Sequence, residues 1–314
     1  MRHALCEKSF IIKSDTMKWL QAFIQFSRPH TIIGTTLSVV GLYLIAWAHV
    51  GTPPWQWEIL FPALLSCLGA NIYIVGLNQL TDVEIDRINK PHLPLAAGTY
   101  SLRTGKAIIA VCLLISLLIA LREGFFLTLT VILSLLIGTA YSLPPLRLKR
   151  FHLWAAACIF TVRGVVVNLF LFLHFNRQLS GAVDIPPQMW ALTAFIFGLS
   201  LVIAWFKDIP DMEGDSRFRI MTLSLTLGAR KVFNVGRGLL AACYLGLIVA
   251  GIAGIPGVNG AVLAATHAGL LGMMWLASLR ATPGNRASIA RYYLFIWVLF
   301  FSEYIFFPIA CLAA

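Results

Sequence analysis

Charged residues are scarce in this sequence. Asp, Glu, Lys and Arg make up only 12% of its 314 residues, whereas a soluble domain carries about a quarter. Hydrophobic residues reach 59%, and the mean hydropathy is +0.83. This composition excludes an ordinary soluble globule and predicts an all-α, polytopic membrane protein in contact with membrane lipid.

The cysteine pattern excludes a disulfide framework. The six cysteines lie far apart and form no CxxC pair, so we interpret them as small hydrophobic residues. The N-terminus shows neither the order of a signal peptide nor a Ser/Arg-rich transit peptide. No soluble domain or low-complexity tract is evident. We therefore expect residues 1–314 to form one transmembrane domain, with a short polar segment over about 1–18.

Apolar runs long enough to cross a membrane as a helix, ~17–25 residues, occur nine times. They cover residues 31–49, 59–80, 105–121, 124–143, 151–174, 188–206, 232–252, 258–278 and 290–312. The third and fourth runs are separated only by Arg122-Glu123-Gly124. Nine spans predict a bundle of transmembrane helices.

The basic residues are distributed asymmetrically about these spans. The N-terminus and the loops after the second, fourth, sixth and eighth spans would lie on one side, and they contain 21 of the 24 Lys and Arg residues. Only Arg122 and Arg177 lie opposite, and Arg163 lies inside the fifth span. By the positive-inside rule the basic side is cytoplasmic. Membrane orientation thus explains the net charge of +11 better than binding to nucleic acid, because the basic residues are dispersed over short loops.

An acidic cluster follows the second span. Asn78, Asp82 and Asp86 recur every four residues, so on a helix they would form one stripe of oxygen ligands, about 6 Å apart. Glu84 would point away from this stripe, and we interpret it as a solvated charge.

A second acidic cluster follows the sixth span. Asp208, Asp211 and Asp215 would share a face if this segment is helical, although Pro210 removes a backbone donor and is expected to start a new helix. The two clusters hold seven of the thirteen acidic residues, and both face the basic side. So much negative charge at two places in a basic protein predicts a cation site.

Two facing groups of hard oxygen ligands suit Mg²⁺, which proteins usually hold through one or two carboxylates plus phosphate oxygens of a substrate. Several cations could bind the same phosphates and stabilise a leaving group. They are Arg87, Lys90, Arg147, Lys149 and Lys207. A phosphate site at the mouth of an apolar bundle indicates a substrate with a polar head and a long apolar tail. If that substrate is an allylic diphosphate, its ionisation leaves a carbocation that must be shielded from water.

Two other interpretations of the clusters stay open at this point. The carboxylates could pair with loop cations on a wet surface, although two clusters at ligand spacing on one side favour a metal site. The chain could also be a divalent-cation transporter, since intramembrane acids mark ion pathways. A transporter would place acids at mid-membrane depth, whereas both clusters follow their spans and have basic neighbours.

Three ionisable residues lie within or at the start of spans. Arg163 is expected either to bind the carboxylate of an acidic substrate or to pair with an acid or a carbonyl. His30 could hydrogen-bond a phenol or abstract a ring proton, or it could cap the first span. Glu303 in the last span is open to the same two kinds of role, functional or paired.

These features together resemble the UbiA-type intramembrane prenyltransferases, and this resemblance implies that the helices surround a central cavity. The resemblance rests on the nine spans, on Asn78-x-x-x-Asp82-x-x-x-Asp86 and on Asp208-x-x-Asp211-x-x-x-Asp215. From about residue 19 to the end, five segments further resemble the homogentisate phytyltransferase branch. They are Phe26-Ser27-Arg28-Pro29-His30-Thr31, residues 71–80, Asn89-Lys90-Pro91, Leu93-Pro94-Leu95-Ala96 and residues 207–215. Homogentisate solanesyltransferases share much of this pattern, so the alternative is a homogentisate solanesyltransferase or another polyprenyltransferase of aromatic or chlorophyll type.

The resemblance implies Mg²⁺-dependent transfer of a phytyl group from phytyl diphosphate to homogentisate, with loss of CO₂ and diphosphate, on the route to tocopherols. It implies that the five aspartates of the two motifs are catalytic and hold the metals together with Asn78. It also implies that Tyr141, Arg147 and Lys149 contact the diphosphate, and we expect Arg28 to bind substrate. No protein partner is indicated. The missing transit peptide favours a cyanobacterial-type thylakoid or plasma membrane, with the acidic motifs on the cytoplasmic side.

Overall fold

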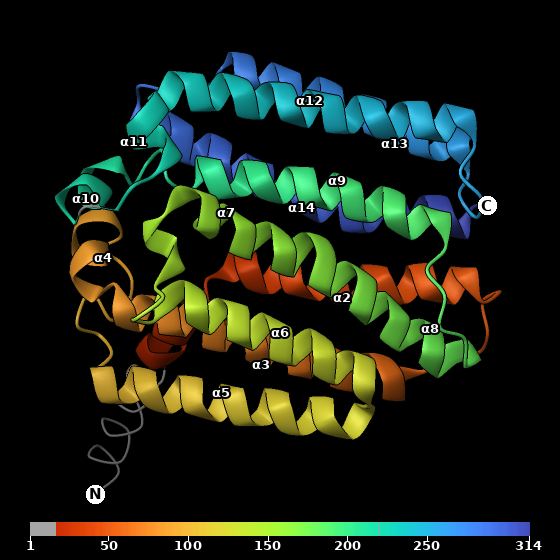
Figure 1. The fold of residues 1–314 in the computed structure, drawn as a ribbon, viewed down its shortest axis with the longest axis horizontal. Helices are drawn as coiled ribbons and strands as arrows, with labels where there is room; N and C mark the ends of the chain where they lie inside the picture. The colour runs from red at the N-terminus through yellow and green to blue at the C-terminus, as the bar shows by residue number, and fades with distance from the viewer. Residues whose placement is uncertain (1–16, 219) are drawn as a thin grey trace, which may run out of the picture.

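The computed structural model describes residues 17–218 and 220–314, and helices form most of it (Figure 1). The helices are α2 (Pro29–His49), α3 (Trp57–Thr81), α4 (Val83–Asn89), α5 (Leu102–Glu123), α6 (Phe125–Ser142), η1 (Leu148–Arg150), α7 (His152–Phe160), η2 (Thr161–Leu171), α8 (Phe172–Ser180), α9 (Pro187–Phe206), α10 (Met212–Arg217), α11 (Leu223–Leu227), α12 (Ala229–Ala253), α13 (Gly260–Leu279) and α14 (Arg286–Leu312). Residues 17–26 are also helical. The polar segment expected over 1–18 therefore falls almost entirely outside the described residues.

Within the described residues, nine helical segments are long and apolar enough to cross a membrane, as the sequence predicts. One of them is composite, since α7, η2 and α8 form a single span over His152–Ser180. The third and fourth spans are separated at Gly124, whose φ of 114° ends α5 and allows α6 to begin. The prediction of an all-α polytopic membrane protein is confirmed.

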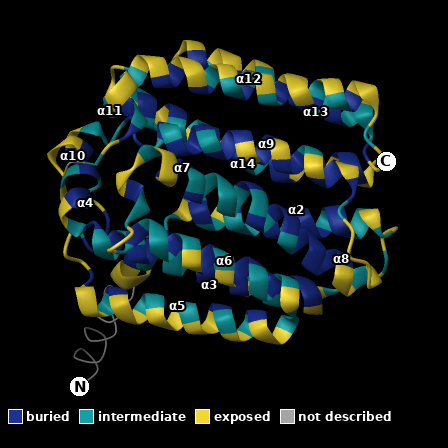
Figure 2. Cartoon of the chain, in the orientation of Figure 1, coloured by how far each residue is buried: buried dark blue, intermediate teal, exposed yellow. Residues whose placement is uncertain are grey.

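The spans differ in how much of their surface the protein covers. The most apolar window of α9 is 67% buried, whereas that of α5 is only 17% buried (Figure 2). Because lipid is as apolar as a protein core, an outward-facing span can expose large hydrophobic residues. The arrangement places α5 at one edge of the bundle, α12 and α13 at the other, and α2, α9 and α14 between them (Figure 1).

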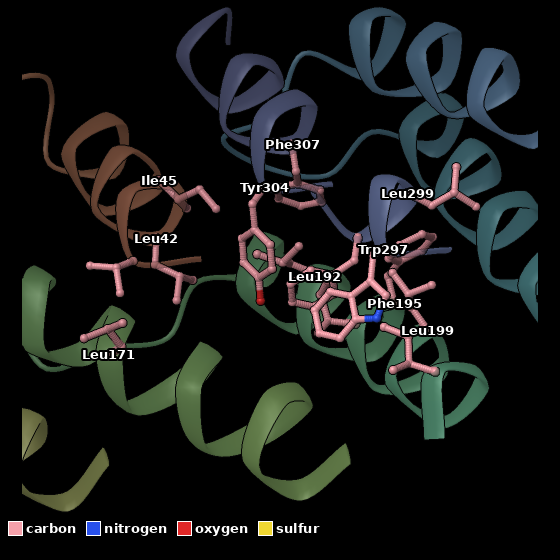
Figure 3. Packing of buried hydrophobic residues seen from close by; sticks show 14 of the residues in the cluster. Leu42, Ile45, Leu171, Leu192, Phe195, Leu199, Trp297, Leu299, Tyr304 and Phe307 are labelled. Carbon is pink, nitrogen blue, oxygen red and sulfur yellow. The ribbon is translucent and has the colours of Figure 1, made fainter. Parts of the chain in front are cut away.

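Close helix packing builds the centre of the bundle. Gly41 of α2 lies against α14, where a Cβ would come within 2.8 Å of the Tyr304 carbonyl oxygen. Small residues at helix contacts are a usual means of association in membranes. Figure 3 shows Leu42, Leu192 and Tyr304 from α2, α9 and α14 converging in this core.

Two short helices extend the bundle at one end. α4 follows α3, and α10 follows α9 after a turn; the two lie side by side (Figure 1). Each carries part of one acidic motif. The fold therefore brings together two motifs that are more than a hundred residues apart in the sequence.

Candidate active site

A polar chamber lies at the end of the bundle formed by α4 and α10. Its acidic lining is Asp82, Asp86, Asp208, Asp211 and Asp215, together with the amide of Asn78. Basic side chains line it as well, namely Arg28, Lys90, Lys149, Lys207 and Arg286. The two acidic motifs thus share one cavity.

An apolar cavity continues from the polar chamber into the bundle. It has an empty volume of about 1410 Å³, part of it open, and its wall includes Val39, Cys67, Val131, Ile159 and Phe300. Six residues line both cavities: Arg28, His30, Asn78, Tyr141, Lys207 and Tyr293. The polar chamber and the apolar cavity therefore adjoin each other along these six residues.

The first acidic motif does not lie on one continuous helix, so the prediction of an uninterrupted stripe is wrong. α3 ends at Thr81, and Asp82 occupies the break with φ −120° and ψ 18° before α4 begins at Val83. The Asp86 N–H still donates to the Asp82 carbonyl oxygen at 2.7 Å. Both carboxylates consequently still point into the polar chamber.

The second acidic motif is likewise split. α9 ends at Phe206, the Asp211 N–H donates to the Asp208 carbonyl at 3.3 Å, and α10 begins at Met212 with Asp211 as its N-cap. The new helix therefore begins two residues after Pro210 and not at Pro210 itself. This turn allows all three aspartates of the motif to line the chamber.

Three of the five chamber aspartates form ion pairs. The pairs are Asp82 with Lys149 (2.6 Å) and Arg147 (3.0 Å), Asp208 with Lys207 (2.5 Å), and Asp211 with Lys90. Lys149 also donates to Asn78 Oδ1 at 3.0 Å and to Thr81 Oγ1 at 2.9 Å. Arg147 does not line the chamber, but it contacts the carboxylate that does. Cations and carboxylates thus lie next to each other in the chamber.

The structure places Arg87 away from this site, contrary to the sequence-based expectation. Its guanidinium pairs with Glu84 at 2.8 Å, and both side chains are more than half exposed. Arg87 follows Asp86 directly and therefore points about 100° away from it around α4. The interpretation of Glu84 as a solvated charge agrees with this geometry.

Burial perturbs the chamber carboxyls that lack an ion pair. Desolvation raises the pKa of Asp86 to about 6, against the opposing effect of Lys90 and Arg28. Burial, followed by repulsion from Asp208 and Asp211, raises the pKa of Asp215 to about 7. Desolvation lowers the pKa of Lys149 to about 8 in spite of its Asp82 partner. Asp86 Oδ2 is buried and has no hydrogen-bond partner within the described part of the chain.

The donor set of the chamber fits Mg²⁺. Every candidate ligand is a carboxylate or amide oxygen, and Mg²⁺ is a hard cation that prefers oxygen. Among residues 17–218 and 220–314, no three carboxylate, imidazole or thiol groups converge on one point. Such a site suits a cation held by one or two carboxylates and completed by phosphate oxygens. The unpartnered Oδ2 of Asp86 is available for such a bond.

Two guanidinium groups line the apolar cavity without an ion-pair partner in the described chain. Arg163, on η2, stacks 4.3 Å from the centroid of Trp297, and its Nη1 is buried without a hydrogen-bond partner. The alternative of pairing with an acid or carbonyl is therefore not seen. Arg28 has two buried, unpartnered nitrogens, Nε and Nη2, and a left-handed φ of 54°. Unpaired buried cations of this kind are suited to an anionic ligand.

His30 lies where the polar chamber and the apolar cavity meet. It lines both, and its ring stands edge-on to Trp297 with 4.8 Å between centroids. Trp297 itself was not expected from the sequence. Its spacing from Tyr293 and Phe300, four and three residues along α14, is the signal that indicates one common helix face.

Comparison with known proteins supports this picture. The model of the UbiA prenyltransferase family matches residues 36–299. Homogentisate phytyltransferase from Synechocystis sp. is 50% identical over 94% of this chain and 96% of that protein. Homogentisate phytyltransferase 1 from Arabidopsis thaliana is 42% identical over 92% of this chain and 75% of that protein. A solved UbiA homologue from Archaeoglobus fulgidus, bound to GPP and Mg²⁺, has the same fold, with a TM-score of 0.65 and 18% sequence identity. The match covers 93% of this chain and 100% of that chain.

Proposed function

Because the chain belongs to the UbiA prenyltransferase family, we propose that it transfers the phytyl group of phytyl diphosphate to homogentisate, with loss of CO₂ and diphosphate. The reaction is a step on the route to tocopherols. The 50% identity to a homogentisate phytyltransferase over almost the whole of both chains favours this acceptor and this donor over a solanesyl donor.

The observation that carries the proposal is that the two cavities adjoin each other. A polar chamber of carboxylates and lysines suits a diphosphate, and the apolar cavity behind it suits a long prenyl tail. The acidic groups lie at the ends of the spans, next to basic side chains. This placement fits a phosphate-bearing substrate better than the mid-membrane pathway of a cation transporter.

In this proposal Asn78, Asp82, Asp86, Asp208, Asp211 and Asp215 hold Mg²⁺. The metal, when bound, neutralises charge on the departing diphosphate. Lys90, Lys149 and Lys207 line the same chamber and contact the diphosphate oxygens, while Arg147 supports the site through Asp82. The apolar cavity keeps water from the allylic carbon as its bond to oxygen breaks.

The acceptor is assigned to the junction of the two cavities. Arg163, supported by Arg28, binds the homogentisate carboxylate, since both line the cavity with buried nitrogens that have no partner among the described residues. His30 lies at the same junction and is placed to hydrogen-bond a phenol or to accept the ring proton. The faces of Trp297 and Phe300 shield the developing cation.

The distribution of basic residues supports a cytoplasmic location for the acidic motifs. We place the protein in a thylakoid or plasma membrane of cyanobacterial type, where phytyl diphosphate partitions into the lipid.

Incubation of the purified protein with labelled phytyl diphosphate and homogentisate tests the proposal. Release of diphosphate that requires both substrates, and that stops when EDTA removes Mg²⁺, is the expected result. Diphosphates of different chain length, each tested with homogentisate and with 4-hydroxybenzoate, identify the preferred pair. Mg²⁺ flux into liposomes without any turnover would instead identify a transporter.

A further inference from the structure

One buried side chain joins the two acidic motifs. Asn89, the last residue of α4, accepts a hydrogen bond at its Oδ1 from the Gly214 N–H at 3.1 Å. Gly214 lies in α10, directly before Asp215, and Asn89 follows Asp86 by three residues. The contact therefore connects the segments that carry Asp86 and Asp215.

The approach of α10 to α4 requires glycine at position 214 for reasons of space. A Cβ there would lie 2.4 Å from Asn89 Oδ1, 2.5 Å from Nδ2 and 2.6 Å from Cγ. The backbone of Gly214 is ordinary, since it is not among the glycines with positive φ. The amide of Asn89 thus occupies the volume that any larger residue at 214 would need.

Two further contacts surround this hydrogen bond. Lys90 pairs with Asp211, and Arg286 at the start of α14 donates from Nη2 to the Asn89 carbonyl at 3.1 Å. Arg286 Nη1 also lies 3.8 Å from Glu213 Oε2, but both side chains are about half exposed, so this pair contributes little. The buried amide and the Lys90–Asp211 pair therefore join the two helices, and only the amide contacts the backbone beside Asp215.

We propose that Asn89 is a positioning residue, which sets the spacing between Asp86 and Asp215 so that both motifs bind one diphosphate together with its Mg²⁺. The inference rests on the proposed function and deepens it. Asn89 itself lines the polar chamber, and it acts there by holding the backbone of Gly214. Carboxylates that are held rigidly at the right separation bind a metal–diphosphate without having to reorganise. A change in that separation weakens binding of magnesium pyrophosphate and leaves the aromatic acceptor largely unaffected.

Calorimetric titration of the purified protein with magnesium pyrophosphate tests this role in a double-mutant cycle. Asn89→Ala and Gly214→Ala are each expected to raise the Kd about threefold to tenfold, the range for loss of one buried hydrogen bond. The double variant should bind better than the two single effects predict, because alanine at 89 removes the atoms that a new Cβ would meet. Equal effects of Gly214→Ala in both backgrounds, or wild-type affinity in folded Asn89→Ala, would overturn the proposal.

Asn176→Ala is the matched control. Asn176 is also a buried asparagine, and its Nδ2 donates to Asp184 Oδ1 at 2.8 Å, but it lies on α8 and lines neither cavity. This variant should lower the Tm and keep the wild-type Kd, and a rise in Kd like that of Asn89→Ala would assign the effect to general destabilisation. Should Asn89→Ala yield no folded protein, Asn89→Ser takes its place with the same expectations.

These results are independent of catalytic turnover. A wild-type protein that binds magnesium pyrophosphate but transfers no prenyl group to homogentisate would overturn the proposed function and leave the role of Asn89 standing. If the wild type turned over substrate and all Asn89 and Gly214 variants bound pyrophosphate with unchanged Kd, the proposed function would stand and the role of Asn89 would be overturned.

Discussion

Asp86 differs from Asp82 because no cation among the described residues pairs with it. Its Oδ2 has no partner, and burial raises its pKa to about 6. Asp82, in contrast, is held by Lys149 and Arg147. The charge on Asp86 therefore costs stability in the protein alone and is useful only when a metal binds.

Replacement of Asp86 by asparagine is expected to separate function from stability. Asp86→Asn should lower turnover at least about a hundredfold, ~2.7 kcal/mol in the barrier, because a metal ligand loses its charge. The Tm should stay the same or rise, since a neutral amide avoids burial of an unpaired carboxylate. Asp82→Asn should reduce both turnover and Tm, because buried Lys149 loses its partner. Diphosphate release and thermal unfolding in detergent measure the two effects, and a large fall in Tm for Asp86→Asn would show that the carboxylate is structural.

Arg163 offers a second prediction at this scale. Arg163→Met should raise the KM for homogentisate about tenfold or more, given the ~1.5–3 kcal/mol of a charged hydrogen bond. The KM for phytyl diphosphate should change less than about twofold. Arg237→Met is the matched control, because Arg237 also stacks on a tryptophan, 4.9 Å from the Trp275 centroid, but lines neither cavity. Two-substrate kinetics in which Arg163→Met leaves homogentisate unaffected would remove the carboxylate role.

Helix ends are the level at which sequence and structure diverge most. The spans are predictable because an apolar run of sufficient length has few alternatives in lipid. The break at Asp82 is not, since the spacing of Asn78, Asp82 and Asp86 also fits an unbroken helix. The cations that hold Asp82 at the break lie 65 or more residues away in the chain. The stacking of Arg163 on Trp297 is also a contact between residues far apart in the sequence, because Trp297 lies on the last helix.

The pairing of α13 with α14 resolves the role of Glu303 left open by the sequence. His267 Nε2 lies 3.0 Å from Glu303 Oε2, and His267 Nδ1 lies 2.7 Å from the Leu263 carbonyl. Both side chains are fully buried and line neither cavity. Glu303 is therefore a paired residue that joins two helices.

Loss of one partner should destabilise the helix pair more than loss of both. Glu303→Leu is expected to cost about 1–3 kcal/mol, because it leaves the buried Nε2 of His267 without its hydrogen-bond partner. The double variant His267→Leu/Glu303→Leu should recover much of that loss, since apolar residues replace the whole pair. Thermal unfolding measures both. Turnover at a temperature where all variants are folded should match the wild type, and a specific loss of activity would indicate a catalytic role for the pair.

At the scale of the whole molecule, the bundle sets the depth of the apolar cavity. On α6, Tyr141 lines both cavities, while Val131 lines only the inner one, ten residues or about 15 Å further along the helix. One turn beyond Val131, Leu127 is fully buried in the core with Leu42 and Leu171. No α6 residue before Thr130 lines the cavity, so a prenyl tail that enters from the chamber reaches Val131 near the far end.

A larger side chain at Val131 should therefore shorten the tail that the enzyme accepts. Val131→Phe is expected to lower kcat/KM for phytyl diphosphate relative to geranyl diphosphate about tenfold or more, in line with ~1–3 kcal/mol for a methylene group that no longer fits. The KM for homogentisate should be unchanged, because His30 lies at the junction of the two cavities and Arg163 contacts the same Trp297 ring as His30. Ile132→Phe is the control. Ile132 follows Val131 directly, but its side chain is 36% exposed and lines neither cavity. If Val131→Phe and Ile132→Phe showed the same ratio of kcat/KM for the two donors, the tail would leave the bundle elsewhere, toward the lipid.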